Sequence, residues 1–321
     1  MRVSGKIWDS KSSGAVHIIV RFGIALFALG IMLVLAFLGS ESISEYARDG
    51  LSLSVKCVIP SVFPFLILSD LYVAYGMPEE IKPLAAFISK LIKIPKIALR
   101  PIICGWLCGF PVGMKITSEL YSSGCLSRRD AERICAVSNT PSPAFVIGAV
   151  GCGMWGSSTL GIIMLICVLT SSVITGCIFR KCGSTENRSL NVASSFDFVE
   201  SVKSAGVNSV TISSFIIIFS VITGLVGDLA LPSIFLGIIS AILELTNACR
   251  FLSADIGISD AISFMLTGLS LGFGGASVAM QSYIFIRNSD LRISRYLGLK
   301  LINGCICAVI SLVGFCVYKS L

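Results

Sequence analysis

Apolar runs of about 20 residues recur along nearly the whole chain. An α-helix of that length crosses a hydrocarbon core of roughly 30 Å, so each run is a candidate membrane span. The runs without a polar break are residues 18–38, 55–76, 159–179, 207–226 and 297–318. The composition agrees, since 55% of the residues are hydrophobic, 13% are charged and the mean hydropathy is +0.89. These values lie outside the range of soluble domains. We therefore expect an all-α polytopic membrane protein.

Four further apolar segments carry a break near the middle, where glycine, proline or polar residues replace the apolar ones. These segments are residues 99–121 broken at 109–113, 131–155 broken at 139–143, 231–252 broken at 244–247, and 258–286 broken at 272–275. Each half has about ten residues, too few to cross a membrane alone. Interrupted helices are tolerated in a membrane where they line a cavity. We expect the first and third segments to be re-entrant hairpins, and the second and fourth to be broken transmembrane helices.

The two halves of the chain repeat this order of segments. Sequence echoes support a duplication, because Ser54-Val55-Lys56 recurs as Ser201-Val202-Lys203 and part of the stretch at 126–131 recurs at 258–261. An odd number of crossings in each repeat would give the halves inverted topology. We expect an N-terminal segment with one extra span (1–50), a first repeat (51–180), a cytoplasmic linker (181–203) and a second, inverted repeat (204–321). Residues 78–95 are expected to form a helix in the membrane interface.

The formal net charge of +7 is spread over short loops between the apolar runs. If both hairpins return to their own side, the face opposite the basic loops keeps only Arg48, Arg250 and Lys319. The positive-inside rule then places the N-terminus in the cytoplasm. This distribution does not favour nucleic acid as a partner; the bilayer is the expected one. The oligomeric state is left open, a homo-oligomer included.

The sequence offers few ligands for a metal ion. Most of the 13 cysteines lie inside apolar runs, no CxxC pair occurs, and the single histidine, His17, precedes the first run. Cysteine in such positions behaves as a small hydrophobe. No pairing of a nucleophile with a base is evident. We expect no metal, no cofactor and no enzymatic activity.

The breaks define the expected substrate site, because they occur at matching points in the two halves. The candidate residues lie at or just after the breaks and are Gly109, Pro111, Val112, Gly113, Lys115, Glu119, Asn139, Thr140, Ser142, Glu244, Thr246, Asn247, Gly275, Ser277 and Gln281. The competing interpretation is that glycine and proline only kink packed helices, while serine and threonine bond their own backbone. That interpretation suits a single break, whereas four breaks in register favour a site.

Three charged residues near the breaks are candidates for a functional role. Lys115 and Glu119 are four residues apart on one helical face, so they form either an ion pair or an anion contact beside a titratable carboxylate. Glu244 has no basic neighbour in the sequence closer than Arg250. A carboxylate isolated in an apolar segment is expensive, which favours a functional role for Glu244.

The first repeat resembles a known family. The run at 108–116, the loop at 127–132 and the segments 139–143 and 147–151 look like the sporulation integral membrane protein family called YlbJ or SpoVV. The second repeat matches through residues 244–247 and 274–277. One departure is Met114, where a smaller residue, commonly alanine, is expected. The family belongs to the nucleoside-recognition or Gate-domain group and is related in architecture to concentrative nucleoside transporters.

The resemblance implies a role in endospore formation, in which the family passes dipicolinate from the mother cell across the outer forespore membrane. Half-helix N-termini at Val112, Ala144 and Ser277 would direct free N–H groups and positive dipole ends at such a small dicarboxylate. A nucleoside-type transporter and a non-transporting scaffold for spore-envelope assembly are the alternatives. Proton coupling through Glu119 and Glu244 and facilitated diffusion fit the sequence equally well.

Overall fold

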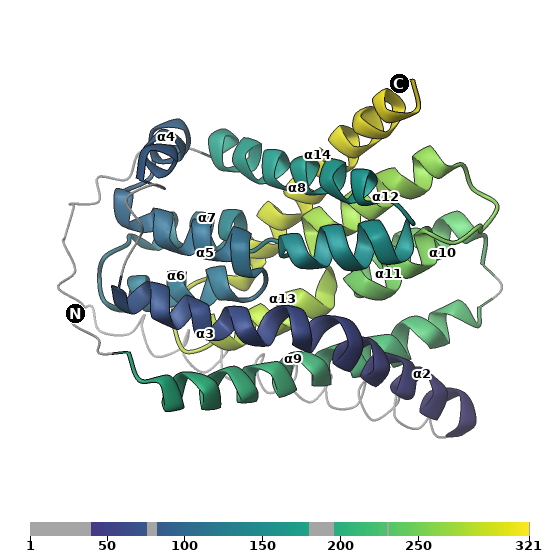
Figure 1. Cartoon of the computed structure of the whole chain (residues 1–321), viewed down its shortest axis with the longest axis horizontal. Coiled ribbons are helices and arrows are strands. Elements are labelled where there is room, and N and C mark those ends of the chain that lie inside the picture. The colour runs from purple at the N-terminus through teal and green to yellow at the C-terminus, as the bar shows by residue number, and fades with distance from the viewer. Residues whose placement is uncertain (1–39, 76–81, 180–195, 230, 321) are drawn as a thin grey trace, which may run out of the picture. The chain divides into compact units, whose positions relative to one another are not determined.

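The structure is a computed structural model that describes residues 40–75, 82–179, 196–229 and 231–320 (Figure 1). The span predicted at 18–38 and most of the predicted linker lie outside the described residues. The chain divides into two compact units, Met1–Tyr46 and Ala47–Leu321, and the first contributes only the initial turns of α2 to the described part. All regular structure in the described part is helical, as the apolar runs predict.

Four stretches of described helix are long and apolar enough to cross a membrane. They are α8 (Ser158–Ile178), α9 (Phe198–Gly227), α12 (Asp260–Phe273) together with α13 (Gly275–Ile286), and α14 (Ile293–Ser320). A fifth candidate span is a bent stretch that consists of α2 (Ser40–Leu53), a π-helical turn (Ser54–Val58) and α3 (Ile59–Tyr75). It bends by 47° between residues 58 and 62, where Pro60 lacks the N–H that a straight helix requires.

Helix α9 begins earlier than its apolar pattern predicts. The Asp197 side chain accepts the N–H groups of Val199 and Glu200, so it caps the first turn. Such a cap satisfies donors that a helix N-terminus leaves free. The last residues of the predicted linker are therefore helical.

The first predicted hairpin is a pair of short helices, α5 (Leu99–Cys108) and α6 (Val112–Ser122), that pack on each other. Gly109 ends α5 with a φ of 84°, a left-handed conformation that costs glycine little. A Cβ on Gly105 would lie 3.1 Å from the Cα of Gly113, so the two helices touch through glycines. Close approach of this kind is typical of helix contacts in membranes.

The other three breaks also lie where the sequence predicts them. Helix α7 (Arg128–Ser138) and the π-helix η4 (Ala144–Met154) each have 11 residues, about 16 Å of helix, so neither crosses a membrane alone. The third break, at Glu244, separates α10 (Ser233–Leu243) from α11 (Leu245–Leu252), and the fourth, at Gly274, separates α12 from α13. Both halves thus follow the order span, helix pair, broken helix, span. Their inverted relationship stays a prediction.

In the first half, α4 (Lys82–Ile92) lies between the span and the helix pair, where the interfacial helix is predicted. Its Ile88 and Ile92 are buried, whereas Phe87 is exposed. A short 3-10 turn (Lys96–Ala98) then leads into α5.

Two loops predicted to share the cytoplasmic side lie against each other. The Tyr121 hydroxyl donates to the carboxylate of Asp290, and Arg128 pairs with the same carboxylate at 3.2 Å. The Tyr121 hydrogen bond and the Arg128 charge hold the pKa of Asp290 below its ordinary value. Arg250, predicted for the opposite side, pairs instead with Asp49 on α2.

Candidate functional site

The four breaks meet within the helical bundle. A Cβ on Gly109 would lie 2.8 Å from the backbone nitrogen of Ser142, so the tip of the first hairpin packs against the break between α7 and η4. A Cβ on Gly275 would lie 3.2 Å from the carbonyl oxygen that ends α10, so the third and fourth breaks pack together in a similar way. A Cβ on Gly274 would lie 3.5 Å from the Phe110 ring, which joins the two pairs of breaks.

A cavity of about 50 Å³ lies at this meeting point. The predicted site residues that line it are Gly109, Ser142, Glu244, Thr246 and Gln281. Apolar side chains of α3 and α9 complete its wall. Because one water needs roughly 10–15 Å³ by this measure, the cavity has room for a few waters and must widen before a larger solute enters.

The carboxylate of Glu244 is held by the start of α11. Glu244 is 2% exposed, and its two oxygens accept the backbone N–H of Asn247 at 2.6 Å and the hydroxyl of Thr246 at 3.2 Å. Its extended backbone, with φ of −145° and ψ of 119°, suits a helix cap. The Asn247 side chain continues to Ser220 of α9 at 2.8 Å. The N-terminal end of α11, which would attract an anion, is thus already occupied by a carboxylate of the chain itself.

Asn139 connects the second break to α13 and α14. Its side-chain nitrogen donates to the Ser282 hydroxyl at 2.8 Å and to the Tyr296 hydroxyl at 2.6 Å. Its backbone carbonyl accepts a hydrogen bond of 2.8 Å from the Lys300 ammonium. The neighbouring Thr140 is fully buried. Asn139 is therefore a structural link between the halves of the bundle, next to the cavity rather than in its lining.

Lys300 is a functional candidate that sequence reasoning missed. Its side chain is 0% exposed, and its ammonium lies 5.9 Å from the centre of the Phe110 ring, which lines the cavity. Among the described residues, no carboxylate forms an ion pair with it. A lysine buried in this way within a membrane helix is costly and marks a functional position.

The signal for Lys300 was a polar stripe on α14. Tyr296, Lys300 and Asn303 follow one another at helical spacing, and all three are buried. The Asn303 amide donates to the Gly272 carbonyl oxygen at 2.9 Å, just before the fourth break. One face of α14 therefore holds both broken helices.

Lys115 and Glu119 do not line the cavity, and Lys115 pairs with Asp70 instead of Glu119. The Lys115 ammonium lies 2.6 Å from one oxygen of Asp70, and Ser201 donates to the other oxygen at 2.9 Å. Helix α3 brings Asp70 to Lys115, whereas Glu119 lies on an exposed part of α6. The sequence does not predict the pairing of Asp70 with Lys115, because the two residues are 45 positions apart.

The remaining predicted site residues lie at the helix ends beside the breaks. Val112 is fully buried, and its N–H donates to the Gly109 carbonyl oxygen at 3.1 Å, so this group is not the free donor expected there. Pro111 precedes it as the N-cap of α6. A Cβ on Gly113 would lie 2.7 Å from the Ser138 carbonyl carbon. Ser277, also fully buried, accepts a hydrogen bond from Gln281 at 3.1 Å.

Comparison with known proteins gives one informative relative. The chain is similar to the sporulation integral membrane protein YlbJ of Bacillus subtilis (strain 168), with 24% identity over 309 aligned residues, which cover 83% of this chain and 76% of the relative. The similarity supports a YlbJ-type sporulation membrane protein. No family model and no solved structure matches the chain. The apolar helices and this YlbJ-type similarity together support an integral membrane protein.

Proposed function

We propose that the chain carries a small organic anion across a membrane during sporulation, with dipicolinate as the cargo. The anion would pass from the mother cell across the outer forespore membrane, through a transporter that has a cytoplasmic N-terminus and no enzymatic activity. The meeting of four helix breaks at one cavity beside a buried lysine carries this proposal. Broken helices in an apolar bundle are costly unless their freed backbone lines a site.

Lys300 supports an anionic cargo. Its ammonium has three donors, of which one is used by the Asn139 carbonyl oxygen, so it can form a charge-assisted bond with a carboxylate that reaches Phe110. The carboxylate of Glu244 is engaged by α11. An entering anion would therefore meet an ammonium group with remaining donors and a carboxylate whose oxygens already accept hydrogen bonds from α11.

A nucleoside-type cargo is the second candidate. The neutral side chains of Ser142, Thr246 and Gln281 line the cavity and could form hydrogen bonds with a base or a ribose. This candidate does not require an ammonium beside the cavity, so Lys300 discriminates between the two.

Uptake by proteoliposomes would test the proposal. The purified chain should accumulate labelled dipicolinate saturably and should not accumulate labelled uridine above empty vesicles. Lys300→Met should lower dipicolinate uptake at least about ten-fold at equal incorporated protein, because a charge-assisted bond contributes roughly 1.5–3 kcal/mol. Lys319→Met is the matched control, since Lys319 lies on the same helix with its side chain 59% exposed, and it should transport at the wild-type rate.

The outcomes separate the candidates. Uptake of uridine without dipicolinate would favour the nucleoside-type transporter. Uptake of neither solute would favour the remaining alternative, a non-transporting scaffold for spore-envelope assembly. Dipicolinate uptake that Lys300→Met does not change would remove Lys300 from the site.

A further inference from the structure

A second cavity opens where α7, α8 and α14 meet, apart from the breaks. Its volume is about 550 Å³, and the side chains that line it include those of Arg129, Arg133, Arg292 and Arg295. Phe179, just beyond the end of α8, contributes to an apolar part of the wall. The lining therefore combines four guanidinium groups and the carboxylate of Asp130 with apolar surface.

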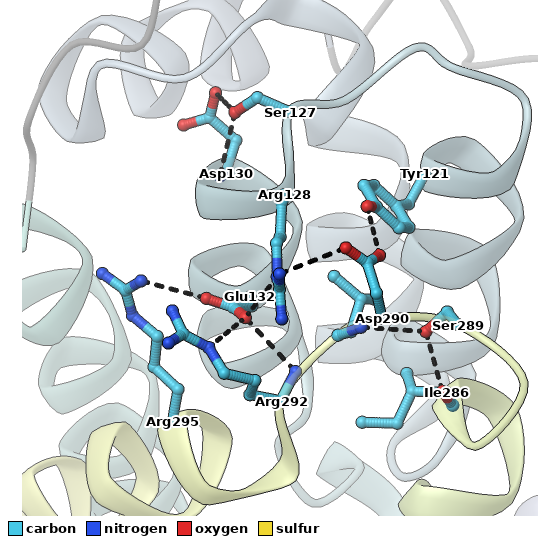
Figure 2. A network of polar contacts seen from close by, with 11 residues as sticks. Tyr121, Ser127, Arg128, Asp130, Glu132, Ile286, Ser289, Asp290, Arg292 and Arg295 are labelled. Atoms are coloured by element: carbon cyan, nitrogen blue, oxygen red, sulfur yellow. Dashed lines mark hydrogen bonds and ion pairs between the residues drawn. The ribbon is translucent and has the colours of Figure 1, made fainter. Parts of the chain in front are cut away.

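Glu132 lies beside this cavity and is shared among several arginines. Glu132 pairs with Arg128 at 3.3 Å, Arg292 at 3.2 Å and Arg295 at 3.0 Å (Figure 2). Glu132 is almost fully buried, whereas the side chains of Arg292 and Arg295 are 55% and 44% exposed. Arginines that share one carboxylate in this way keep donors for a further anion.

Two more arginines, together with Asp130, line the cavity. Arg133 pairs with Asp130 at 3.1 Å and donates to the Lys93 carbonyl oxygen at 3.0 Å, so its position is fixed. Arg129 is exposed, and it forms no ion pair with a carboxylate of the described residues. The cavity thus has an excess of positive charge, with four arginines against Asp130, and Arg129 is exposed.

The apolar wall indicates what kind of anion fits. Ile178 lines the cavity, is 59% exposed and ends α8, a helix long and apolar enough to span a membrane. The end of such a helix lies at the depth of the lipid headgroups. Phe179, 38% exposed, extends this apolar surface. A free inorganic ion would make no favourable contact with this apolar surface, whereas the acyl chain of a lipid could lie along it.

We propose that this cavity binds the phosphate headgroup of an anionic phospholipid from the adjacent leaflet. Guanidinium groups match phosphate oxygens with paired N–H donors, and basic pockets between membrane helices suit such headgroups. The lipid phosphate would bridge Arg129 on α7 and Arg292 and Arg295 at the start of α14, and so stabilise the contact between these helices drawn in Figure 2. This binding does not depend on the transported solute.

Thermal unfolding of the delipidated, full-length protein in detergent would test the proposal. Phosphatidylglycerol should raise the unfolding midpoint in a concentration-dependent manner, since a ligand of the folded state stabilises it. Phosphatidylcholine with the same acyl chains and inorganic phosphate should not. Arg129→Gln should weaken the apparent affinity for phosphatidylglycerol about five-fold, the effect of one arginine near an anionic surface. Arg129→Lys should retain most of the affinity.

Arg128→Gln is the matched control. It removes the same charge from the adjacent position, but Arg128 does not line the cavity, so the lipid-induced shift should stay at the wild-type value even if the midpoint without lipid falls. An equal shift with phosphatidylcholine, an equal shift with inorganic phosphate, or equal losses in Arg128→Gln and Arg129→Gln would each overturn the proposal.

Discussion

The ammonium of Lys115 on α6 lies 2.6 Å from a carboxylate oxygen of Asp70 on α3. Ser201 on α9 donates to the other oxygen of that carboxylate at 2.9 Å. One acidic side chain therefore joins the first hairpin to a span from each half of the chain. The Lys115 and Asp70 side chains are 15% and 25% exposed, so water screens this pair only in part.

Breaking the ion pair between Lys115 and Asp70 should lower the stability of the protein more than it changes the selectivity for the transported solute. Lys115→Met and Asp70→Asn should each destabilise the protein by about 1–2 kcal/mol, because each leaves a partly buried partner without its counter-ion. The double variant should recover most of the loss. Unfolding midpoints in detergent and dipicolinate uptake, measured on the same preparations, would check this. Recovery with Glu119→Gln in place of Asp70→Asn would instead favour the pairing between neighbours on α6.

Glu244 should tolerate aspartate better than glutamine. Glu244→Gln removes the negative charge that binds the start of α11, which should cost about 1 kcal/mol of stability and lower dipicolinate uptake as the hairpin tip shifts. Glu244→Asp keeps the charge on a side chain favoured at helix N-caps. Uptake rates normalised to incorporated protein, with unfolding midpoints alongside, would compare the variants. Wild-type uptake and stability in Glu244→Gln would show that the charged cap is dispensable.

A methyl group at Gly113 should disrupt the first tip. The new Cβ would lie 2.7 Å from the Ser138 carbonyl carbon, a backbone atom that cannot rotate away, so Gly113→Ala should cost about 3 kcal/mol or more. Gly206→Ala on α9 is the control, because no atom lies within 4 Å of its added Cβ. It should be neutral or slightly stabilising, as alanine favours helix. Equal unfolding midpoints for the two variants would contradict the tight contact.

The positions of the breaks could be predicted from the sequence because local chemistry sets them. Gly109 takes a left-handed φ, and Glu244 caps the helix that follows it. Both breaks can therefore be recognised from the type of residue at these positions. The partners of Lys115 and Lys300 could not be predicted in that way. Both depend on which helix packs beside them, and Asp70 and Asn139 are distant in the sequence.

The loop contacts also sharpen the topology prediction. Tyr121 and Asp290 are hydrogen-bonded across 169 residues, so their loops must share one side of the membrane, and the basic residues around them favour the cytoplasmic side. On a cysteine-depleted background, Tyr121→Cys and Asp290→Cys should be joined by a short bifunctional maleimide and labelled only from the cytoplasmic side. Asp255→Cys, in the loop after α11, should be labelled only from the opposite side. Labelling of Asp255→Cys and Asp290→Cys from the same side would exclude the inverted relationship of the two halves.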